Sequence, residues 1–310
     1  MLTKSNHVIF FVMSYVKLLI SKLYSAPPRF AGGLVLNILG YHILRIITFN
    51  LFHSLRKKKL PKDPEGRRIY REVLDNGIVS IPYFFPEDVF QKIKEECYRS
   101  EKEVISEKSP RMLRSTLVRD DKGTSNPILE KYLAKNDLIN KVVSALLGKD
   151  ILISPKVYFE ETFYSDEDLG KPTSDFQDHL HFDVSYPTVK CLYYLNDVNE
   201  DNAAFEFVKG SQKMTLKRLW LEYKMSVAFW LWSKERRERE FPEINLDFMR
   251  RNKMVATPII GQGNTLVIAN TMGFHRRGIH RTTKPRHLIF VDYRELETLK
   301  FLKRKLLRHA

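Results

Sequence analysis

The part of the chain that most constrains its fold is the run HLHFD, in which polar side chains occupy alternate positions. These side chains are His179, His181 and Asp183. In an extended strand, alternate residues point to the same face, so two imidazoles and a carboxylate can enter one cavity. A His-x-Asp pair joined by one distant histidine is the two-histidine, one-carboxylate ligand set of non-haem iron sites. The plain alternative is a strand edge with unrelated polar residues, and a downstream partner must decide between the two.

Four later histidines are candidates for the distant ligand: His275, His280, His287 and His309. His275 is favoured because it follows the β-rich run GQGNTLVIAN, which would deliver it to the rim of a barrel. Arg286 comes eleven residues later and opens the apolar run HLIFVDY. The guanidinium fork of an arginine at such a rim suits a carboxylate. His280 is the alternative third ligand, although its spacing to Arg286 is short.

These residues and their flanks resemble the phytanoyl-CoA dioxygenase family of Fe(II)/2-oxoglutarate oxygenases. The resemblance covers most of residues 70–293, including GIVSIPYFFPEDVFQKIK before the motif and LYYLNDVNEDNAAFEFVKGSQK after it. Two departures concern Asn202, Ala203 and Ala204, where the family usually has a Gly-containing turn, and Gln212, where it has a histidine. Neither departure falls on a metal ligand, so both bear on the substrate side of the site.

The resemblance implies that His181, Asp183 and His275 bind Fe(II) and that Arg286 binds the far carboxylate of the cosubstrate 2-oxoglutarate, with O₂ as the second cosubstrate. His179 is a competing first ligand, and otherwise a hydrogen-bonding neighbour of the site. The implied reaction is hydroxylation of a C–H bond. Halogenation is disfavoured because Asp183 supplies the carboxylate that related halogenases lack.

Strands on either side of the motif are expected to line the cavity. We therefore consider Tyr158, Glu161 and Tyr193, together with His179, as tentative pocket residues, although ordinary barrel packing is the favoured explanation for the first three. The sequence does not identify the substrate, because pocket-lining residues come from loops and insertions.

The expected fold class is α+β, with a double-stranded β-helix (a jelly-roll, cupin-like core) flanked by helices. Short apolar runs with Gly and Asn turns indicate antiparallel strands. Residues 106–126 are polar and are expected to form a loop. Helices are expected at 68–76, 86–105 and 127–147, and strands near 77–84, 151–165, 180–185, 189–196, 204–208, 255–260, 264–269 and 286–293.

The N-terminal residues 1–59 are expected to form a separate apolar segment. The runs 8–20 and 31–52 predict a helical hairpin around a proline turn, and basic residues at 56–59 favour the cytoplasmic side of a membrane with anionic lipids. The catalytic domain would then occupy 60–310 on that side. The alternative is that both helices pack as core in a soluble cytoplasmic protein.

A helical insertion is expected at about 213–254, as a lid or as an interfacial helix, because all three tryptophans stand there in a helical pattern. A basic helix is expected at 294–308. The net charge of +15 points to an anionic partner. A membrane surface fits better than nucleic acid, since no nucleic-acid-binding module is recognisable. Two separated cysteines favour a reducing compartment.

Two function classes follow. The first is a dioxygenase that hydroxylates a lipid, acyl or lipid-linked small molecule at a membrane surface. The second is a catalytically inactive, membrane-associated binding or scaffold relative, which the complete set of His181, Asp183, His275 and Arg286 disfavours. The oligomeric state is left open.

Overall fold

The computed structural model describes seven stretches of the chain, which fall into two compact units. One unit contains the described residues before 56 together with 214–239, and the other contains the described residues of 59–213 and 243–293. Most of the predicted insertion therefore groups with the N-terminal segment. The described stretches are 30, 32–55, 59–107, 110–118, 126–148, 156–239 and 243–293.

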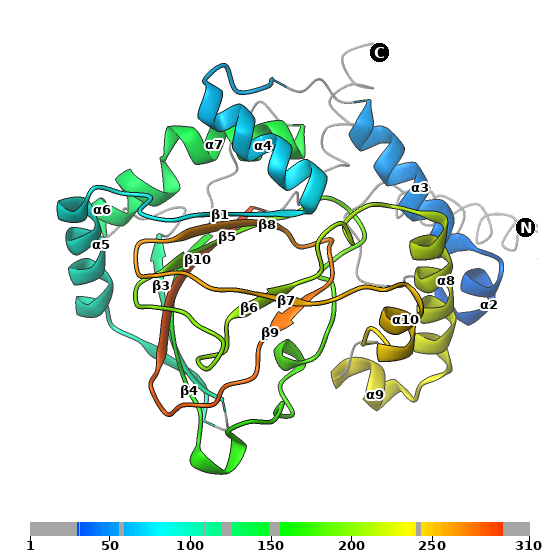
Figure 1. Ribbon diagram of the computed structural model, residues 1–310. Coiled ribbons are helices and arrows are strands. Elements are labelled where there is room, and N and C mark those ends of the chain that lie inside the picture. Colours follow the sequence, from blue (N-terminus) through cyan, green and yellow to red (C-terminus); the bar gives the residue numbers. More distant parts are fainter. Residues whose placement is uncertain are drawn as a thin grey trace, which may run out of the picture. The chain divides into compact units, whose positions relative to one another are not determined.

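The larger unit is built on an antiparallel sheet, whose seven described strands run in the order β1-β8-β5-β10-β4-β3-β2 (Figure 1). Strand β10 lies at its centre and pairs along its length with β4 and β5. The strands are β1 (Ile78–Ile81), β2 (Glu103–Ser106), β3 (Arg111–Val118), β4 (Lys156–Phe163), β5 (Val189–Tyr194), β8 (Leu266–Asn270) and β10 (Arg286–Tyr293).

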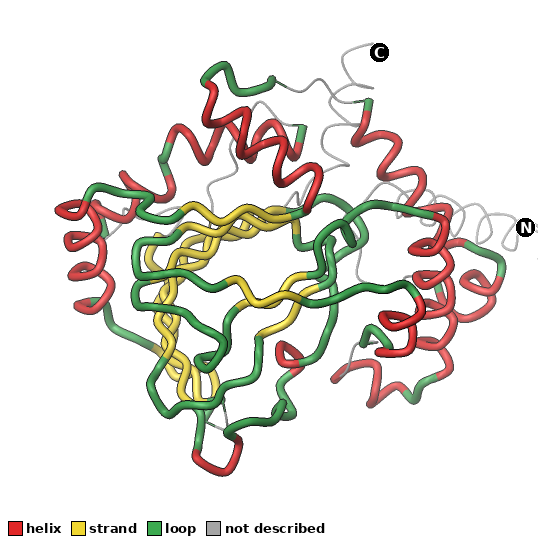
Figure 2. Tube along the Cα trace, viewed as in Figure 1, coloured by secondary structure: helices red, strands yellow, loops and turns green. Residues whose placement is uncertain are grey.

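A second, smaller sheet of three described strands faces the first, in the order β7-β6-β9 (Figure 2). Its members are β7 (Thr257–Ile259), β6 (Phe205–Phe207) and β9 (His275–Arg277). Apolar side chains of both sheets meet between them, among them Leu192 and Leu288 of the larger sheet and Phe207 of the smaller. The mixed α/β fold with two facing antiparallel sheets resembles the jelly-roll core expected from the sequence.

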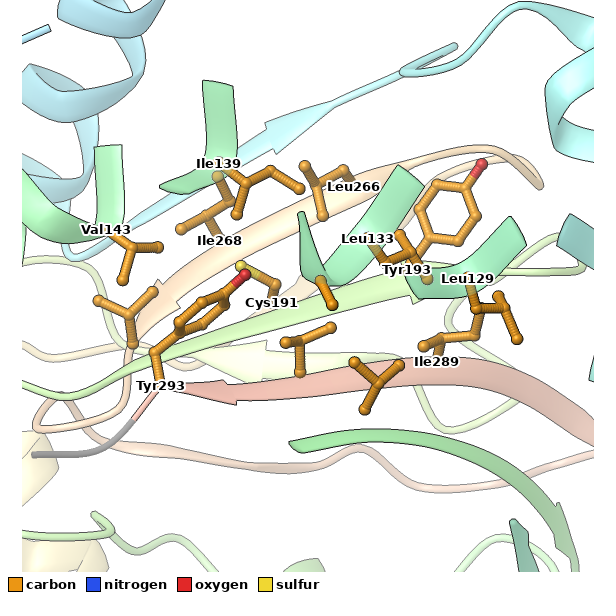
Figure 3. Packing of buried hydrophobic residues seen from close by; sticks show 14 of the residues in the cluster. Leu129, Leu133, Ile139, Val143, Cys191, Tyr193, Leu266, Ile268, Ile289 and Tyr293 are labelled. Carbon is orange, nitrogen blue, oxygen red and sulfur yellow. The ribbon is translucent and has the colours of Figure 1, made fainter. Parts of the chain in front are cut away.

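Helices cover the other face of the larger sheet. Figure 3 shows Ile139 and Val143 of a covering helix facing Cys191, Ile268 and Tyr293 of the sheet. Side chains of β4, β5 and β10 thus alternate between this helix-covered face and the face between the sheets. The helices are α4 (Pro64–Asn76), α5 (Glu87–Arg99), α6 (Pro127–Leu129) and α7 (Asp137–Leu147), and a short helix α10 (Leu246–Arg251) also belongs to this unit.

Capping residues set the helix ends. Helix α4 begins before the expected residue 68 because the Asp63 carboxylate accepts a hydrogen bond from Gly66 N at 2.6 Å and Pro64 stands at the first helical position. The helix expected at 127–147 is interrupted. A π-helix over Glu130–Ala134 follows α6, and Asn136 then caps α7, because its Oδ1 accepts a hydrogen bond from Ile139 N at 3.0 Å.

Two strand expectations were wrong. The expected loop at 106–126 contains β3, an eight-residue strand that pairs with β4 over Arg111 to Val118. Its polar residues concealed it, because Arg111, Arg114, Ser115 and Thr116 break the apolar/polar alternation that marks a strand. The expected strand at 180–185 is reduced to one bridge, between His181 and His275.

The smaller unit is helical. The predicted helix at 31–52 is divided into α2 (Gly33–Ile38) and α3 (Tyr41–Ser54), because Gly40 adopts the left-handed region with φ 84°. Helix α8 (Leu216–Leu231) joins them through Tyr223 Oη, which donates to Ile38 O at 3.0 Å. A short helix α9 (Lys234–Arg239) follows. Runs 8–20, 56–58 and 294–308 lie outside the described residues.

Within the described part of the chain, no helix combines the length and the apolar character needed to cross a membrane. Helix α8 leaves Leu216, Trp220 and Leu231 exposed. Its buried face carries Arg218 and Glu222 as well as apolar residues.

Candidate metal centre

Backbone pairing brings the two histidines of the predicted site together. His181 N donates to His275 O at 2.9 Å, and His275 N donates back to His181 O at 2.8 Å. Residues paired in this way across antiparallel chains place their side chains on the same side, and the two imidazole centroids lie 4.5 Å apart. Asp183, two residues along, adds its carboxylate, and one ligand atom from each of the three lies within 4.8 Å of the others.

Hydrogen bonds fix which nitrogen of each imidazole faces the centre. His181 Nδ1–H donates to His179 O at 2.7 Å, and His275 Nδ1–H donates to Gly273 O at 2.9 Å. A carbonyl oxygen only accepts, so both rings carry their proton on Nδ1. Each Nε2 therefore presents a lone pair toward Asp183 Oδ1, at 4.0 Å from His181 and 3.6 Å from His275. This is the tautomer that metal-binding histidines require.

Asp183 is held in its ionised form. Burial alone would raise its pKa, but the ammonium of Lys190, with Nζ 3.3 Å from Oδ2, holds that pKa well below its usual range. Lys190 is thus paired with Oδ2 of Asp183, while Oδ1 faces the two histidines. Sequence reasoning missed Lys190. Lys190 lies on the face of β5 that points between the sheets, because alternate strand residues share a face. This alternation is the signal that could have identified it.

The donor set fits a divalent transition metal such as Fe(II). His275 is 2 % exposed, and its Nε2 has no hydrogen-bond partner among the described residues. A buried nitrogen of this kind carries a desolvation cost unless a ligand compensates it. Phe176 and Phe205 pack against the imidazoles, with ring centroids 4.2 Å from His181 and 5.3 Å from His275, so the rings are held in place on their outer sides.

Arg286 opens β10 and shares a strand face with Leu288, which packs between the sheets. Its Nη1 donates to Ala203 O, and its Nη2 lies 3.7 Å from Glu160 Oε1. Ala203 has φ 58°, a left-handed conformation that glycine adopts more easily. Ala203 therefore adopts a left-handed conformation in the turn where a glycine was expected. The carbonyl oxygen of Ala203 orients Arg286.

Buried charges surround Arg286. Glu160 accepts from Arg114 Nη2 at 2.6 Å, and although burial would raise its pKa, Arg286 and Arg114 hold that pKa below its usual range. Arg277 is paired with Asp175 at 2.8 Å and with Asp178 at 3.4 Å. The Nε of Arg286 has no hydrogen-bond partner in the described part of the chain. It remains available to an anionic ligand.

His179 contributes mainly through its backbone. Its carbonyl oxygen orients His181, whereas its own ring contacts Thr173 O at 3.1 Å and Glu243 Oε1 at 3.3 Å. The imidazole is not in the group of three that gathers around the centre. Of the other histidines considered, His287 forms a hydrogen bond between its Nδ1 and Tyr98 Oη at 2.7 Å. His280 is not in the group of three that gathers around the centre, and position 309 lies outside the described residues.

The other three tentative pocket residues face different ways. Tyr158 stacks on Phe290 at 4.8 Å on the side of β4 that carries Glu160. Glu161 and Tyr193 point to the helix-covered face, where Glu161 lies 3.8 Å from His287 Nε2 and Tyr193 belongs to the helix-packed core. Their neighbours Glu160 and Tyr194 face the interior instead, and sequence reasoning missed both.

Comparison with known families gives a match to the model of the family described as phytanoyl-CoA dioxygenase (PhyH), over residues 73–287. This range is well over half of the chain and contains all three residues of the triad and Arg286. No curated protein sequence matches the chain.

Solved structures with similar folds share little sequence with the chain. The non-haem α-ketoglutarate-dependent epimerase SnoN from nogalamycin biosynthesis is 14% identical over 75% of this chain and 84% of its own, with TM-score 0.49. HygX from Streptomyces hygroscopicus is 17% identical over 73% and 86%, with TM-score 0.43, and a Pseudomonas putida prolyl-4-hydroxylase is 13% identical over 75% and 100%, with TM-score 0.45. These similarities are too low to support an inference about activity.

Proposed function

The chain belongs to the phytanoyl-CoA dioxygenase family, and from that premise we propose that it hydroxylates a C–H bond of a lipid, acyl or lipid-linked small molecule. As a member of this family it is an Fe(II)/2-oxoglutarate-dependent oxygenase, with O₂ as the second cosubstrate. What remains to be proposed is the role of each residue, the substrate class and the place of action.

We assign Fe(II) to His181, Asp183 and His275. The single observation that carries this assignment is the convergence of two Nδ1-protonated imidazoles and one ionised carboxylate within 4.8 Å. Bound iron would supply the site at which O₂ is activated. The protein's part is to hold both Nε2 lone pairs and Asp183 Oδ1 toward one point, with Lys190 on the second carboxylate oxygen.

We assign the far carboxylate of 2-oxoglutarate to Arg286. Its open Nε and its place among buried charges support this role. In the overall reaction, 2-oxoglutarate, O₂ and R–H give succinate, CO₂ and R–OH. One oxygen atom enters succinate and the other enters the product, so the two electrons released by decarboxylation and the two from the C–H bond reduce O₂ completely.

The proposed hydroxylation is tested by incubating the purified full-length protein with Fe(II), 2-oxoglutarate, air and crude membrane lipid. Succinate release coupled to a lipid product heavier by one oxygen atom is the expected result. Untargeted lipid analysis of cells with and without the protein would then identify the substrate. Absence of succinate with a correctly loaded metal site would favour the alternative, an inactive binding or scaffold relative.

Action at an anionic membrane surface is proposed from the helical unit. Helix α3 carries exposed apolar side chains at Leu44, Ile47 and Leu51, and Leu55 follows directly after the helix, each between 48% and 71% exposed. Their spacing of three and four residues places them on one side of the helix. Trp220 of α8, 58% exposed, adds an aromatic side chain of the type enriched at headgroup depth.

Vesicle sedimentation tests the membrane proposal. We expect the full-length protein to bind anionic vesicles at low salt, and a Leu44→Ser, Leu51→Ser double variant to bind weakly while keeping its 2-oxoglutarate site. A matched control is Leu74→Ser on α4, which is 49% exposed in the other unit. Recovery of the wild-type protein entirely in the soluble fraction at low salt, without detergent, would contradict membrane association and leave the oxygenase reaction intact.

A further inference from the structure

His280 is a buried histidine that the assigned triad does not use. It is fully buried, at 0% exposure, and neither Nδ1 nor Nε2 has a hydrogen-bond partner among the described residues. An imidazole has at least one N–H to donate and, when neutral, one lone pair. Burying both nitrogens without partners is costly, and an unsatisfied group of this kind in a native interior calls for a ligand or an ordered water.

The turn that orients Arg286 also fixes the position of His280. Asn202 forms an antiparallel bridge with His280, and Ala203 O accepts the hydrogen bond from Arg286 Nη1. Successive residues of one turn therefore hold the histidine and the arginine. Both side chains are buried, and both retain nitrogens without a partner in the described chain, namely Arg286 Nε and the two ring nitrogens of His280.

Two further neighbours of His280, Tyr164 and Arg277, form no hydrogen bond with its ring in the described chain. Tyr164 meets it edge to face, with centroids 4.4 Å apart, and Arg277 Nη1 donates to Tyr164 Oη at 3.2 Å. Burial, with Arg286 and Arg277 nearby, lowers the pKa of His280 to about 4. The imidazole is therefore neutral at physiological pH, carries one N–H, and lies close enough to the guanidinium groups of Arg286 and Arg277 to feel their charge.

We propose that His280 donates a hydrogen bond to the distal carboxylate of the dicarboxylate cosubstrate, beside Arg286. This inference rests on the proposed function, in which Arg286 anchors 2-oxoglutarate. It adds a second donor to that anchor and gives the site a means of distinguishing a dicarboxylate 2-oxo acid from one that ends in a methyl group. A carboxylate oxygen would satisfy both the open Arg286 Nε and the open ring nitrogen.

The test compares two probes on the full-length protein loaded with Fe(II) without O₂. One probe is 2-oxoglutarate, and the other is 2-oxobutanoate, which has the same metal-chelating end but no distal carboxylate. For His280→Phe we expect the dissociation constant of 2-oxoglutarate to rise roughly 10- to 100-fold, as for loss of a hydrogen bond to a charged group. The dissociation constant of 2-oxobutanoate should not change.

Two further variants separate a donor from a packing role. His280→Asn places an amide N–H near the position of Nδ1, and His280→Gln places one near Nε2, so one of them should bind 2-oxoglutarate more tightly than the Phe variant does. His287→Phe, a histidine on the helix-covered face, is the matched control and should bind both probes as the wild type does. If the Phe variant does not fold, the binding of 2-oxoglutarate and 2-oxobutanoate is compared in the Asn and Gln variants instead.

Equal weakening of both probes, or unchanged binding of 2-oxoglutarate in all three variants, would overturn the role of His280. A wild-type protein that binds neither probe would overturn the proposed function itself. Wild-type preference for 2-oxoglutarate combined with an unaffected His280→Phe variant would overturn only the inference drawn from His280.

Discussion

The two units each bury a group of charged or basic side chains, and they treat these groups differently. In the helical unit, Glu222 is 0% exposed and its carboxylate is occupied on both oxygens. Arg218 Nε lies 2.9 Å from Oε1, and His42 Nε2 lies 3.1 Å from Oε2. Nδ1 of His42 lacks a hydrogen-bond partner among the described residues, but the buried acid itself is fully paired.

In the barrel, by contrast, the buried nitrogens of His275, His280 and Arg286 have no hydrogen-bond partner in the described chain. Their positions are nevertheless fixed by backbone pairing and by carbonyl oxygens. A buried polar group without a partner destabilises a folded protein unless something else binds it. The paired acid of the helical unit therefore stabilises that unit, whereas the open nitrogens of the barrel are arranged for ligands.

The largest expected effect is the loss of the metal site in His275→Ala. Without its Nε2 the centre retains two ligands, and Fe(II) affinity should fall by more than about 100-fold, since changes to groups that merely support a ligand already cost 10- to 100-fold. Equilibrium dialysis with Fe(II) measures this, and His287→Ala is the control. Undiminished Fe(II) affinity would place the metal elsewhere.

Glu222→Ala should lower the stability of the folded protein rather than its affinity for Fe(II). Removing the acid breaks its buried ion pair with Arg218, and breaking such a pair costs about 3–5 kcal/mol, so the free energy of unfolding measured in urea should drop by that order. Glu65→Ala on α4 breaks a half-exposed pair with Arg68 and should cost less than about 1 kcal/mol. Similar small losses in both variants would mean that the helical cluster does not stabilise its unit.

Arg286→Ala should weaken the binding of 2-oxoglutarate and leave the binding of Fe(II) unchanged. Loss of one member of a buried, hydrogen-bonded charge pair costs about 2–4 kcal/mol, which corresponds to a roughly 30- to 700-fold rise in the dissociation constant of 2-oxoglutarate. Arg276, whose side chain pairs with Glu206 at 2.7 Å, provides the control Arg276→Ala. An unaltered 2-oxoglutarate affinity in Arg286→Ala would reject the anchor assignment.

The smallest expected effect belongs to Lys190→Met. The ammonium group orients Asp183 through Oδ2, and its loss should weaken Fe(II) binding about 10-fold, at the lower end of effects seen when a ligand's hydrogen-bonding neighbour is removed. Lys209→Met, at an exposed position, is the control. Tighter Fe(II) binding in Lys190→Met would show that repulsion between the ammonium and the metal outweighs the orientation of the carboxylate.

Spacing in the sequence favoured His275 as the partner of His181 and Asp183, and the family resemblance selected these three residues, which the structure brings together. The match over 73–287 confirms the family. The assignment of Fe(II) to these three residues and of 2-oxoglutarate to Arg286 stays a prediction until binding is measured.

The neighbours of the site were harder to predict. Strands β4 and β5 are buried on both faces, so hydrophobicity does not reveal which of their residues point between the sheets. An error of one residue in the predicted facing therefore selects Glu161 instead of Glu160 and Tyr193 instead of Tyr194 as pocket residues. The strand β3 and the interruption before α7 were missed because tertiary pairing and a local Asn136 cap outweigh composition. Nothing in the sequence distinguishes His280 from an ordinary core histidine.

The most direct test of the barrel site is an anaerobic titration of the full-length protein with Fe(II) and 2-oxoglutarate, followed by visible absorption. A charge-transfer band that requires both additions, and that is missing in His181→Ala and His275→Ala, is the predicted result. A wild-type protein that shows no such band, or a band that persists in both variants, would contradict the account.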